Sequence, residues 1–198
     1  MIKVIIFDNG GVFVTTSSSI FLLSFKKFTG ASLSELRKAY WYLSKPLDTG
    51  KEAEINFYRK FTKKIKFNCS IKELLKIRYS KIKRIPGTGG ILRKVIKKYK
   101  VAMMNNEYKE CMKFLLKKYP YFKYFKKRVT SCEVGFRKPE SQIYKIMLKK
   151  LGVKPEECLF IDDLKDNTKT ARKLGINTIT FRNAKQLKDN LKKFGIFV

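Results

Sequence analysis

The sequence predicts an α/β protein with a mostly parallel sheet, helices on both faces of that sheet, and a helical segment inserted after the first strand. Three observations lead to this prediction. Short apolar runs typical of buried strands alternate with amphipathic helical patterns over most of the chain. Residues 20–84 carry only helical spacings, with apolar residues three and four positions apart. Acidic and amide side chains follow several strands, where open α/β sheets place their ligand crevice.

The first strand is expected within the run MIKVIIFD, because consecutive apolar residues at positions 4–7 are typical of a buried parallel strand. Asp8 stands at the carboxyl end of this strand. Gly10 and Gly11 allow the backbone to turn close to whatever Asp8 faces. This acidic residue in a glycine-rich turn is the first candidate for a functional site.

The insert is expected to contain four helices packed on one another, and the remainder to alternate strands with helices. The helical patterns of the insert cover residues 21–28, 33–43, 55–61 and 71–77, and Pro and Gly at 86–90 mark the return to the main body. Further strands are expected at residues 101–104, 129–132, 158–161 and 176–181, and further helices up to residue 96 and at 108–118, 139–151 and 166–174. This alternation implies parallel strands joined by helical crossovers.

The net charge of +30 is extreme for a chain of 198 residues. Such a charge attracts nucleic acid or other polyanions. Lysines occur in every segment, however, which favours a compositional bias over a dedicated nucleic-acid surface. Only residues 117–128 mix cations with aromatics, and we interpret them as a helix end and a surface loop. We expect anionic substrates, with nucleic acid as a less favoured partner.

Neither a membrane span nor a secretion signal is visible in the sequence. No stretch approaches the roughly 20 apolar residues of a transmembrane helix, and the chain starts directly with a strand. Cys69, Cys111, Cys132 and Cys158 are scattered, without the spacing of metal ligands. We therefore expect a cytoplasmic protein whose cysteines are reduced and serve in packing.

Two further polar sites follow predicted strands in the middle of the chain. Asn105, Asn106 and Glu107 come at the end of the strand at 101–104. Amides and free N–H groups at such a point can hold a phosphate oxygen, or the asparagines can simply cap the next helix. Lys138 directly precedes a proline that suits the first turn of a helix.

The most acidic site follows the strand at 158–161 and contains Asp162, Asp163, Asp166 and Asn167. Adjacent carboxylates repel one another unless a cation is present. Helix capping explains one of these residues but not three. Because Mg²⁺ prefers carboxylate, carbonyl and water oxygens, the cluster indicates a magnesium site.

Together these segments resemble the haloacid dehalogenase-like hydrolase superfamily, in particular its phosphatase branch with a small helical cap. FDNGGV, MMNNE, GFRKPE and FIDDLKDN match its four loops in order, and the resemblance covers nearly the whole chain. It implies a Rossmann-like catalytic core formed by residues 1–14 and 86–198, and a helical cap formed by residues 15–85. It also implies a hydrolase that uses Mg²⁺.

The resemblance implies catalytic and phosphate-binding roles for individual residues. Asp8 matches the nucleophile, which forms a transient aspartyl-phosphate. Lys138 matches the lysine that neutralises the nucleophile and the bound phosphate. Asn105 occupies the position of a Ser or Thr that hydrogen-bonds the phosphoryl group, and Asn106 lies beside it.

The resemblance likewise implies the metal ligands. Asp163 matches the Mg²⁺ ligand, with the carboxylate of Asp8 and the backbone carbonyl of Gly10 as its companions. Asp162 and Asn167 would support these ligands without touching the metal themselves.

One departure concerns the first motif, which in the family is usually D-x-D. Gly10 stands where the second aspartate would protonate the leaving group and activate water. General acid–base catalysis is commonly worth about a hundred- to ten-thousand-fold, so its loss threatens the rate more than binding. Glu107, or an insert residue such as Asp48 or Glu52, could supply the proton.

The D-x-G pattern also resembles a subgroup of sugar-phosphate phosphatases. The favoured interpretation is therefore a Mg²⁺-dependent phosphatase acting on a small phosphorylated metabolite. One alternative is a weak or inactive relative that binds phosphate ligands or nucleic acid. Another is a 2-haloacid dehalogenase, which also lacks the second aspartate but needs no metal, so the Asp162–Asp163 pair argues against it.

Overall fold

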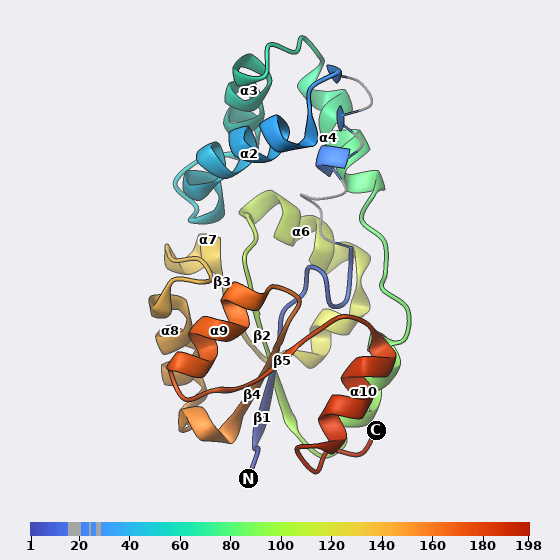
Figure 1. Cartoon of the computed structure of the whole chain (residues 1–198), viewed down its shortest axis with the longest axis vertical. Coiled ribbons are helices and arrows are strands. Elements are labelled where there is room, and N and C mark those ends of the chain that lie inside the picture. Colours follow the sequence, from blue (N-terminus) through green and yellow to red (C-terminus); the bar gives the residue numbers. More distant parts are fainter. Residues whose placement is uncertain (16–20, 24, 27–28) are drawn as a thin grey trace.

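The computed structural model describes residues 1–15, 21–23, 25–26 and 29–198. Its centre is a five-stranded parallel sheet in the order β3-β2-β1-β4-β5 (Figure 1). The strands are β1 (Val4–Phe7), β2 (Lys100–Asn105), β3 (Lys127–Thr130), β4 (Cys158–Asp162) and β5 (Asn177–Thr180). The predicted α/β architecture with a mostly parallel sheet is confirmed.

The first strand lies at the point where the strand order reverses. β1 pairs with β2 on one side and with β4 on the other, so the chain reaches β4 only after crossing back from the β3 edge. Open α/β sheets place their ligand crevice outside the carboxyl ends of the strands at such a switch point. Asp8 and Asp162 stand at these two strand ends.

Helices cover both faces of the sheet because strand side chains alternate between the faces. Ile5 and Phe7 pack with α5 (Thr88–Val95), α6 (Lys109–Lys118) and α10 (Ala184–Lys192). Val4 and Ile6 pack on the opposite face with α8 (Ser141–Leu151) and α9 (Lys165–Lys173). Every residue of β1 is fully buried, as expected for a central strand.

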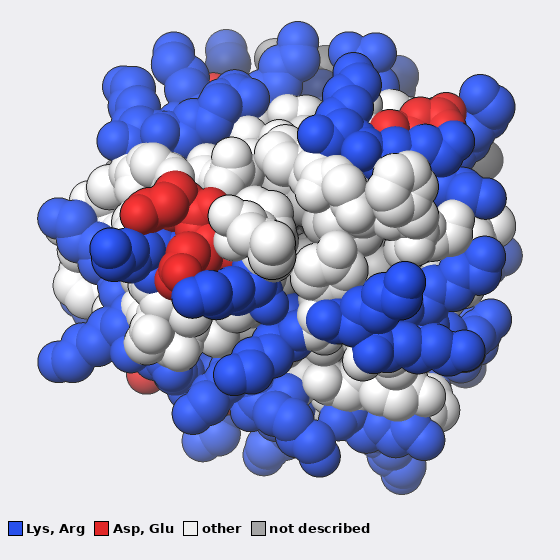
Figure 2. Space-filling model, turned by 90° about the horizontal axis from the view of Figure 1, so that it is seen from below, with Lys and Arg blue, Asp and Glu red and all other residues white. Residues whose placement is uncertain are grey.

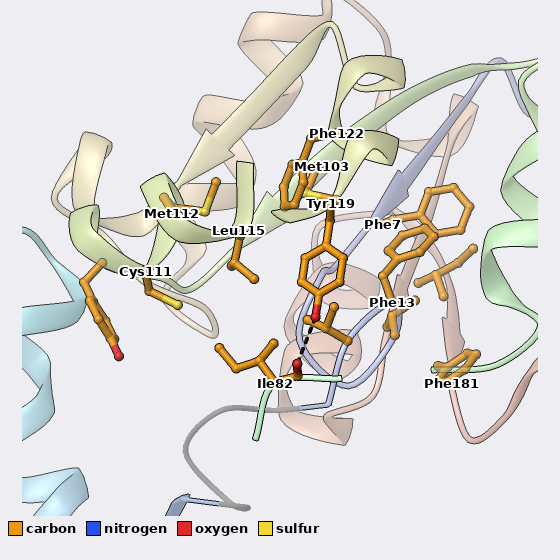
Figure 3. Packing of buried hydrophobic residues seen from close by; sticks show 14 of the residues in the cluster. Phe7, Phe13, Ile82, Met103, Cys111, Met112, Leu115, Tyr119, Phe122 and Phe181 are labelled. Atoms are coloured by element: carbon orange, nitrogen blue, oxygen red, sulfur yellow. Dashed lines mark hydrogen bonds between the residues drawn. The ribbon is translucent and has the colours of Figure 1, made fainter. Parts of the chain in front are cut away.

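The larger apolar cluster extends from the sheet into the turn that follows β1. Phe13 lies 5.4 Å from Phe7, measured between ring centroids, and stacks on Tyr121 at 4.9 Å. The hydroxyl of Tyr119 donates to the carbonyl of Ile82 at 2.9 Å (Figure 3). This packing fixes the turn after Asp8 against the segment that returns from the insert.

Three helices of the insert are described in full, namely α2 (Leu33–Asp48), α3 (Glu54–Lys64) and α4 (Ile71–Ser80). They lie beyond the carboxyl ends of the strands (Figure 1). Ser32 starts α2 with a capping box that involves Glu35, and Ser70 caps α4. The fourth predicted helix, at 21–28, falls partly outside the described residues; residues 21–23 and 25–26 are helical.

Some boundaries differ from the prediction. The strand expected at 129–132 is β3 at Lys127–Thr130, because the short helix α7 (Ser131–Val134) begins directly after it. The helix α10 was not predicted; its buried apolar stripe contains only Leu187 and Leu191, and it begins where Asn183 accepts from the Gln186 N–H. A one-turn helix, η2 (Pro155–Glu157), precedes β4.

Residues 117–128 complete α6 and form the 3₁₀ helix η1 (Pro120–Tyr124) before β3 begins. Within them Tyr119, Phe122 and Phe125 are buried in the core. Lys and Arg spread over the face opposite the insert, interrupted by a few separate acidic patches (Figure 2). No helix among the described residues has both the length and the apolar content needed to cross a membrane, and all four cysteines are free thiols.

Candidate active site

Asp8 is held in place by the strand pairing on both sides of β1. Phe7 is in register with Ile161, and the Asp8 N–H donates to the Ile161 carbonyl at 2.8 Å. The carboxylate oxygen Oδ1 accepts the N–H of Asn9 at 2.7 Å. Only 7% of Asp8 is exposed, and burial raises the pKa of its carboxyl well above the ordinary value although Lys138 acts in the opposite direction.

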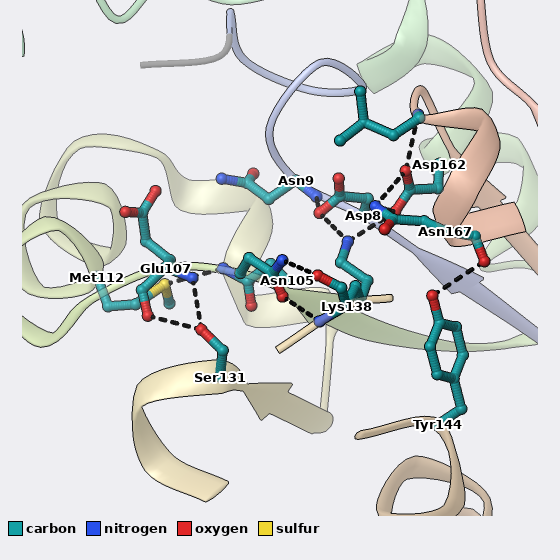
Figure 4. A network of polar contacts seen from close by, with 12 residues as sticks. Asp8, Asn9, Asn105, Glu107, Met112, Ser131, Lys138, Tyr144, Asp162 and Asn167 are labelled. Atoms are coloured by element: carbon teal, nitrogen blue, oxygen red, sulfur yellow. Dashed lines mark hydrogen bonds and ion pairs between the residues drawn. The ribbon is translucent and has the colours of Figure 1, made fainter. Parts of the chain in front are cut away.

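Lys138 brings a buried ammonium group between two carboxylates. Its Nζ lies 2.9 Å from Asp8 Oδ1 and 2.7 Å from Asp162 Oδ2 (Figure 4). Burial acts to lower the pKa of Lys138, but the two carboxylates outweigh it and hold the pKa above its ordinary value. The lysine is therefore charged, and it compensates the carboxylates that the fold has removed from water.

Asp162 is surrounded by donors from the start of α9. The side-chain amide of Asn167 donates to both of its oxygens, at 2.9 and 3.1 Å, and the Leu164 N–H donates to Oδ1 at 2.9 Å. The Asn167 carbonyl in turn accepts the hydroxyl of Tyr144 at 2.9 Å. Because Lys138 also bonds Asp162, this carboxylate acts as an anchor for the lysine.

Asp163 completes an acidic group with Asp8 and Asp162, in which one oxygen of each lies within 4.8 Å of the others. A Cβ atom on Gly11 would lie 2.2 Å from the Asp163 carboxyl carbon, and Gly11 has a φ of +75°, so only glycine fits here. Burial, followed by the charge of Asp162, raises the pKa of Asp163 to about 6. Three carboxylates this close together repel one another, and a hard cation among them would neutralise their charge.

A cavity of about 120 Å³ connects these residues with the insert. The sheet side contributes Asp8, Gly10, Asn106, Glu107, Lys138, Asp163 and Asn167. The insert contributes Tyr40, Trp41, Asp48 and Arg78. The nucleophile candidate therefore faces a space whose walls come from both parts of the chain.

The two asparagines at the end of β2 make contacts that the sequence did not predict. Asn106 holds the Lys138 backbone at both ends, since its Oδ1 accepts the Lys138 N–H and its Nδ2 donates to the Lys138 carbonyl, both at 2.8 Å. Asn105 is buried, with its Nδ2 3.2 Å from the Met112 sulfur, and it does not belong to the described cavity lining. Asn106 thus positions the lysine in this structure, and phosphate contacts by Asn105 and Asn106 stay predictions.

The structure distinguishes among the three candidates for the missing general acid. Glu107 lines the cavity, and burial raises its pKa to about 7 although Arg78 acts to lower it. Asp48 also lines the cavity but is bound to Arg137 at 2.7 Å. Glu52 pairs with Lys60 and is not among the described residues that line the cavity. Glu107 and Asp48 thus both line the cavity, and Glu107 has the looser ion pair, since its Oε1 lies 3.9 Å from Arg78 Nη2.

Sequence reasoning did not single out Arg78 and Trp41 of the insert. Arg78 is fully buried, and its guanidinium carbon lies 4.8 Å from the centroid of the Tyr108 ring. A signal for Arg78 existed, because it occupies the next position of the apolar stripe formed by Ile71, Leu74 and Leu75. A charged residue on such a stripe indicates a buried polar site.

Comparison with protein families gives a match of residues 5–181 to the haloacid dehalogenase-like hydrolases. Among curated proteins, bifunctional epoxide hydrolase 2 of Rattus norvegicus is 45% identical over 65 residues, which are 33% of this chain and 12% of the rat protein. Flavin mononucleotide hydrolase 1 of Arabidopsis thaliana is 41% identical over 68 residues, 34% of this chain and 28% of that protein. The matches thus span only a small part of these relatives.

Solved structures match over nearly the whole chain. A HAD family enzyme of Bacteroides thetaiotaomicron has a TM-score of 0.80 at 25% identity, covering 98% of both chains. The same enzyme in complex with magnesium and inorganic phosphate has a TM-score of 0.76 at 25% identity, covering 92% of this chain and 96% of that one. L-2-haloacid dehalogenase of Xanthobacter autotrophicus shares the fold, with a TM-score of 0.68 at 17% identity over 98% and 83% of the chains.

Proposed function

Because this chain belongs to the haloacid dehalogenase-like hydrolase family, we propose that it is a Mg²⁺-dependent phosphatase that hydrolyses a small phosphorylated metabolite through an aspartyl-phosphate on Asp8. The observation that carries this proposal is the contact of Lys138 Nζ with Asp8 and Asp162 at the edge of a cavity. The proposed catalytic core comprises residues 1–14 and 86–198, and residues 15–85 form the cap.

The donor set of the site suits Mg²⁺. The carboxylates of Asp8 and Asp163 converge, and Gly10, whose backbone carbonyl is the third proposed ligand, lines the same cavity. All three are hard oxygen donors. Asp162 and Asn167 would support the site indirectly, because the Asp162 oxygens are already bonded to Lys138 and Asn167. When bound, Mg²⁺ would neutralise phosphate charge and allow Asp8 to be ionised.

In the first step the Asp8 carboxylate attacks phosphorus, and the bond from phosphorus to the leaving oxygen breaks. The buried Lys138 ammonium is already in place beside the attacking carboxylate, so its stabilisation of the developing negative charge costs little reorganisation. Asn106 preserves that arrangement by fixing the lysine backbone on both sides.

In the second step water attacks the phosphorus of the aspartyl-phosphate, which releases inorganic phosphate and regenerates Asp8. We assign the proton transfers of both steps to Glu107. With a pKa of about 7 it holds a proton for the leaving oxygen and, once deprotonated, can accept one from the attacking water. Glu107 thus takes the role that Gly10 cannot fill.

We expect the protein to hydrolyse p-nitrophenyl phosphate with Mg²⁺ and to lose this activity in EDTA. This substrate has a good leaving group and needs little help from a general acid, so the assay isolates the nucleophile and the metal site. The measurement is the rate of p-nitrophenol release, with Mg²⁺ restored after chelation as the control. A folded protein without activity would point to the alternative, a relative that binds phosphate ligands without turning them over.

Replacement of Glu107 by Gln is expected to separate substrates by their leaving groups. The first step, measured as the burst of p-nitrophenol or alcohol release before the steady state, should change little with p-nitrophenyl phosphate. With an alkyl phosphate such as glycerol phosphate it should slow about a hundredfold or more. The acid form of Glu107 predominates below its pKa of about 7. The alkyl phosphate rate of the wild type should therefore decline above pH 7, and this decline should be absent in the variant.

The matched control for that experiment is Glu110→Gln, an exposed glutamate on the neighbouring helix α6. It should behave as the wild type on both substrates. Equal losses in the first-step rates of both substrates in Glu107→Gln would contradict the assignment, because a general acid matters most for a basic leaving group.

A further inference from the structure

The loop that carries Lys138 also contacts the insert, through the preceding residue, Arg137. Arg137 Nη1 donates to Asp48 Oδ2 at 2.7 Å and to Ser44 Oγ at 3.1 Å. The guanidinium carbon of Arg137 lies 5.7 Å from the centroid of the Trp41 ring. These three partners stand at spacings of three and four on one face of α2. We call Arg137 and these three residues the clasp.

The polar part of the clasp is shielded from water, whereas Trp41 is 55% exposed. The side chains of Arg137 and Asp48 are only 17% and 14% exposed, and Ser44 is fully buried. Exposed ion pairs contribute little because water and salt screen them, but a shielded pair leaves a costly charge behind when one partner is removed. Burial already raises the pKa of Asp48, and the Arg137 hydrogen bond acts against that rise. The contact therefore has a substantial energetic effect.

Two further contacts join the same helix to the same part of the core. Lys45 of α2 pairs with Glu140 at 2.9 Å, although Lys45 is largely exposed. A Cβ atom on Gly50, just after α2, would lie 2.3 Å from the Cys132 carbonyl, so the two backbones are in direct contact. The end of α2 thus rests on the segment that runs from α7 to the lysine loop.

Arg137 and Lys138 are adjacent in the sequence, and their side chains bind different parts of the chain. Arg137 reaches the insert, whereas Lys138 reaches Asp8 and Asp162. The backbone between them is held by the Asn106 amide and by the Glu140 N–H, which donates to the Arg137 carbonyl at 2.8 Å. The peptide bond that joins Arg137 to Lys138 is thus part of the support of both side chains, and a shift of the Arg137 backbone would move it.

We propose that Arg137 is a positioning residue that couples closure of the insert over the cavity to the placement of Lys138 Nζ between Asp8 and Asp162. This inference rests on the proposed function, since it describes how the cap would control that site. When the clasp is closed, the lysine is in place and the cavity has its walls from both sides. When the clasp opens to admit substrate, the lysine loop loses one of its supports.

The test replaces a residue of the insert and measures hydrogen–deuterium exchange in the catalytic core. In Asp48→Asn the side chain keeps its shape but loses the charge that binds Arg137. We expect hydrogen–deuterium exchange in residues 135–140 to become about tenfold faster, because one charge-assisted hydrogen bond that supports this loop is weakened. The matched control is Glu52→Gln, because Glu52 lies near the same helix end but pairs with Lys60 inside the insert. Its exchange in residues 135–140 should equal that of the wild type.

Kinetics on p-nitrophenyl phosphate provide the second readout. Asp48→Asn and Arg137→Met should each lower kcat/KM about tenfold, and the double variant should be no slower than the slower single variant. Arg137→Lys should recover part of the loss, because it keeps the charge but cannot form both hydrogen bonds. Additive losses in the double variant would show that the two residues act independently.

The exchange and kinetic experiments together distinguish a failure of this inference from a failure of the proposed function. A protein that does not hydrolyse p-nitrophenyl phosphate would overturn the phosphatase proposal, while faster exchange in Asp48→Asn would still support the clasp. Unchanged exchange in residues 135–140 of Asp48→Asn would overturn the clasp, whether or not the enzyme is active. Trp41 is the only tryptophan of the chain, so its fluorescence reports whether the α2 face stays folded in each variant.

Discussion

Asp8→Asn is expected to lower the hydrolysis of p-nitrophenyl phosphate by about ten-thousandfold or more, the effect typical of removing a nucleophile. The neutral amide cannot supply the attacking oxygen. The shape of the side chain is kept, and Lys138 retains Asp162 as a partner at 2.7 Å, so the fold should survive. Initial rates with Mg²⁺ measure the loss of activity, and urea unfolding followed by circular dichroism measures the stability of the fold.

The control for this change is Asp189→Asn on α10, which removes an exposed carboxylate that does not belong to the described cavity lining. Its activity and stability should equal those of the wild type. A folded Asp8→Asn protein that keeps full activity would refute the assignment of Asp8 as the nucleophile.

Lys138→Met should lose activity and also a large part of the free energy of unfolding. The substitution leaves the carboxylates of Asp8 and Asp162 close together and without their shared cation in a buried site. Breaking a buried ion pair from one side commonly costs about 3–5 kcal/mol, which is comparable with the whole stability of many domains. Urea unfolding in EDTA gives the change without a contribution from bound metal.

A second substitution separates the electrostatic cause from a packing defect. Lys138→Met combined with Asp162→Asn should recover a substantial part of the lost stability, since one of the two uncompensated charges is gone, but none of the activity. Lys145→Met, at an exposed position of α8, serves as the control for removal of a lysine. If Lys138→Met were as stable as the wild type, the description of the lysine as a charge-compensating anchor would be wrong.

Much of the site could be predicted from the sequence because its residues follow directly from strand ends. The apolar runs at 4–7 and 158–161 identify two buried strands, and in a parallel sheet their carboxyl ends share one edge. Asp8 and Asp162 therefore lie at the same edge, and they are close together because β1 and β4 are neighbouring strands. Lys138 needed the family resemblance, because one lysine among 46 basic residues carries no signal of its own.

The features that were missed depend on contacts between distant parts of the chain. Asn106 bonds the backbone of Lys138, which lies 32 positions later, and Arg137 bonds Asp48 across 89 positions. Neither contact leaves a local pattern in the sequence. The limits of β3 were misjudged for a similar reason, because residues 131–132 are as compatible with a strand as with the short helix that the fold gives them.

The helix α10 was missed for another reason: its own local sequence pattern is weak. Its only buried residues are Leu187 and Leu191, and lysines occupy many of the other positions. In a chain this rich in lysine, a polar face is a poor indicator of an amphipathic helix. The same richness is why the +30 charge tells less about partners than its size suggests.

The most direct test of the central claim is mass spectrometry of the enzyme quenched in acid during turnover of p-nitrophenyl phosphate with Mg²⁺. We predict that the peptide carrying Asp8 gains the mass of one phosphoryl group at early times, and that Asp8→Asn shows no such gain. Continued turnover by an enzyme whose Asp8 peptide stays unmodified at every quench time would contradict an aspartyl-phosphate on Asp8.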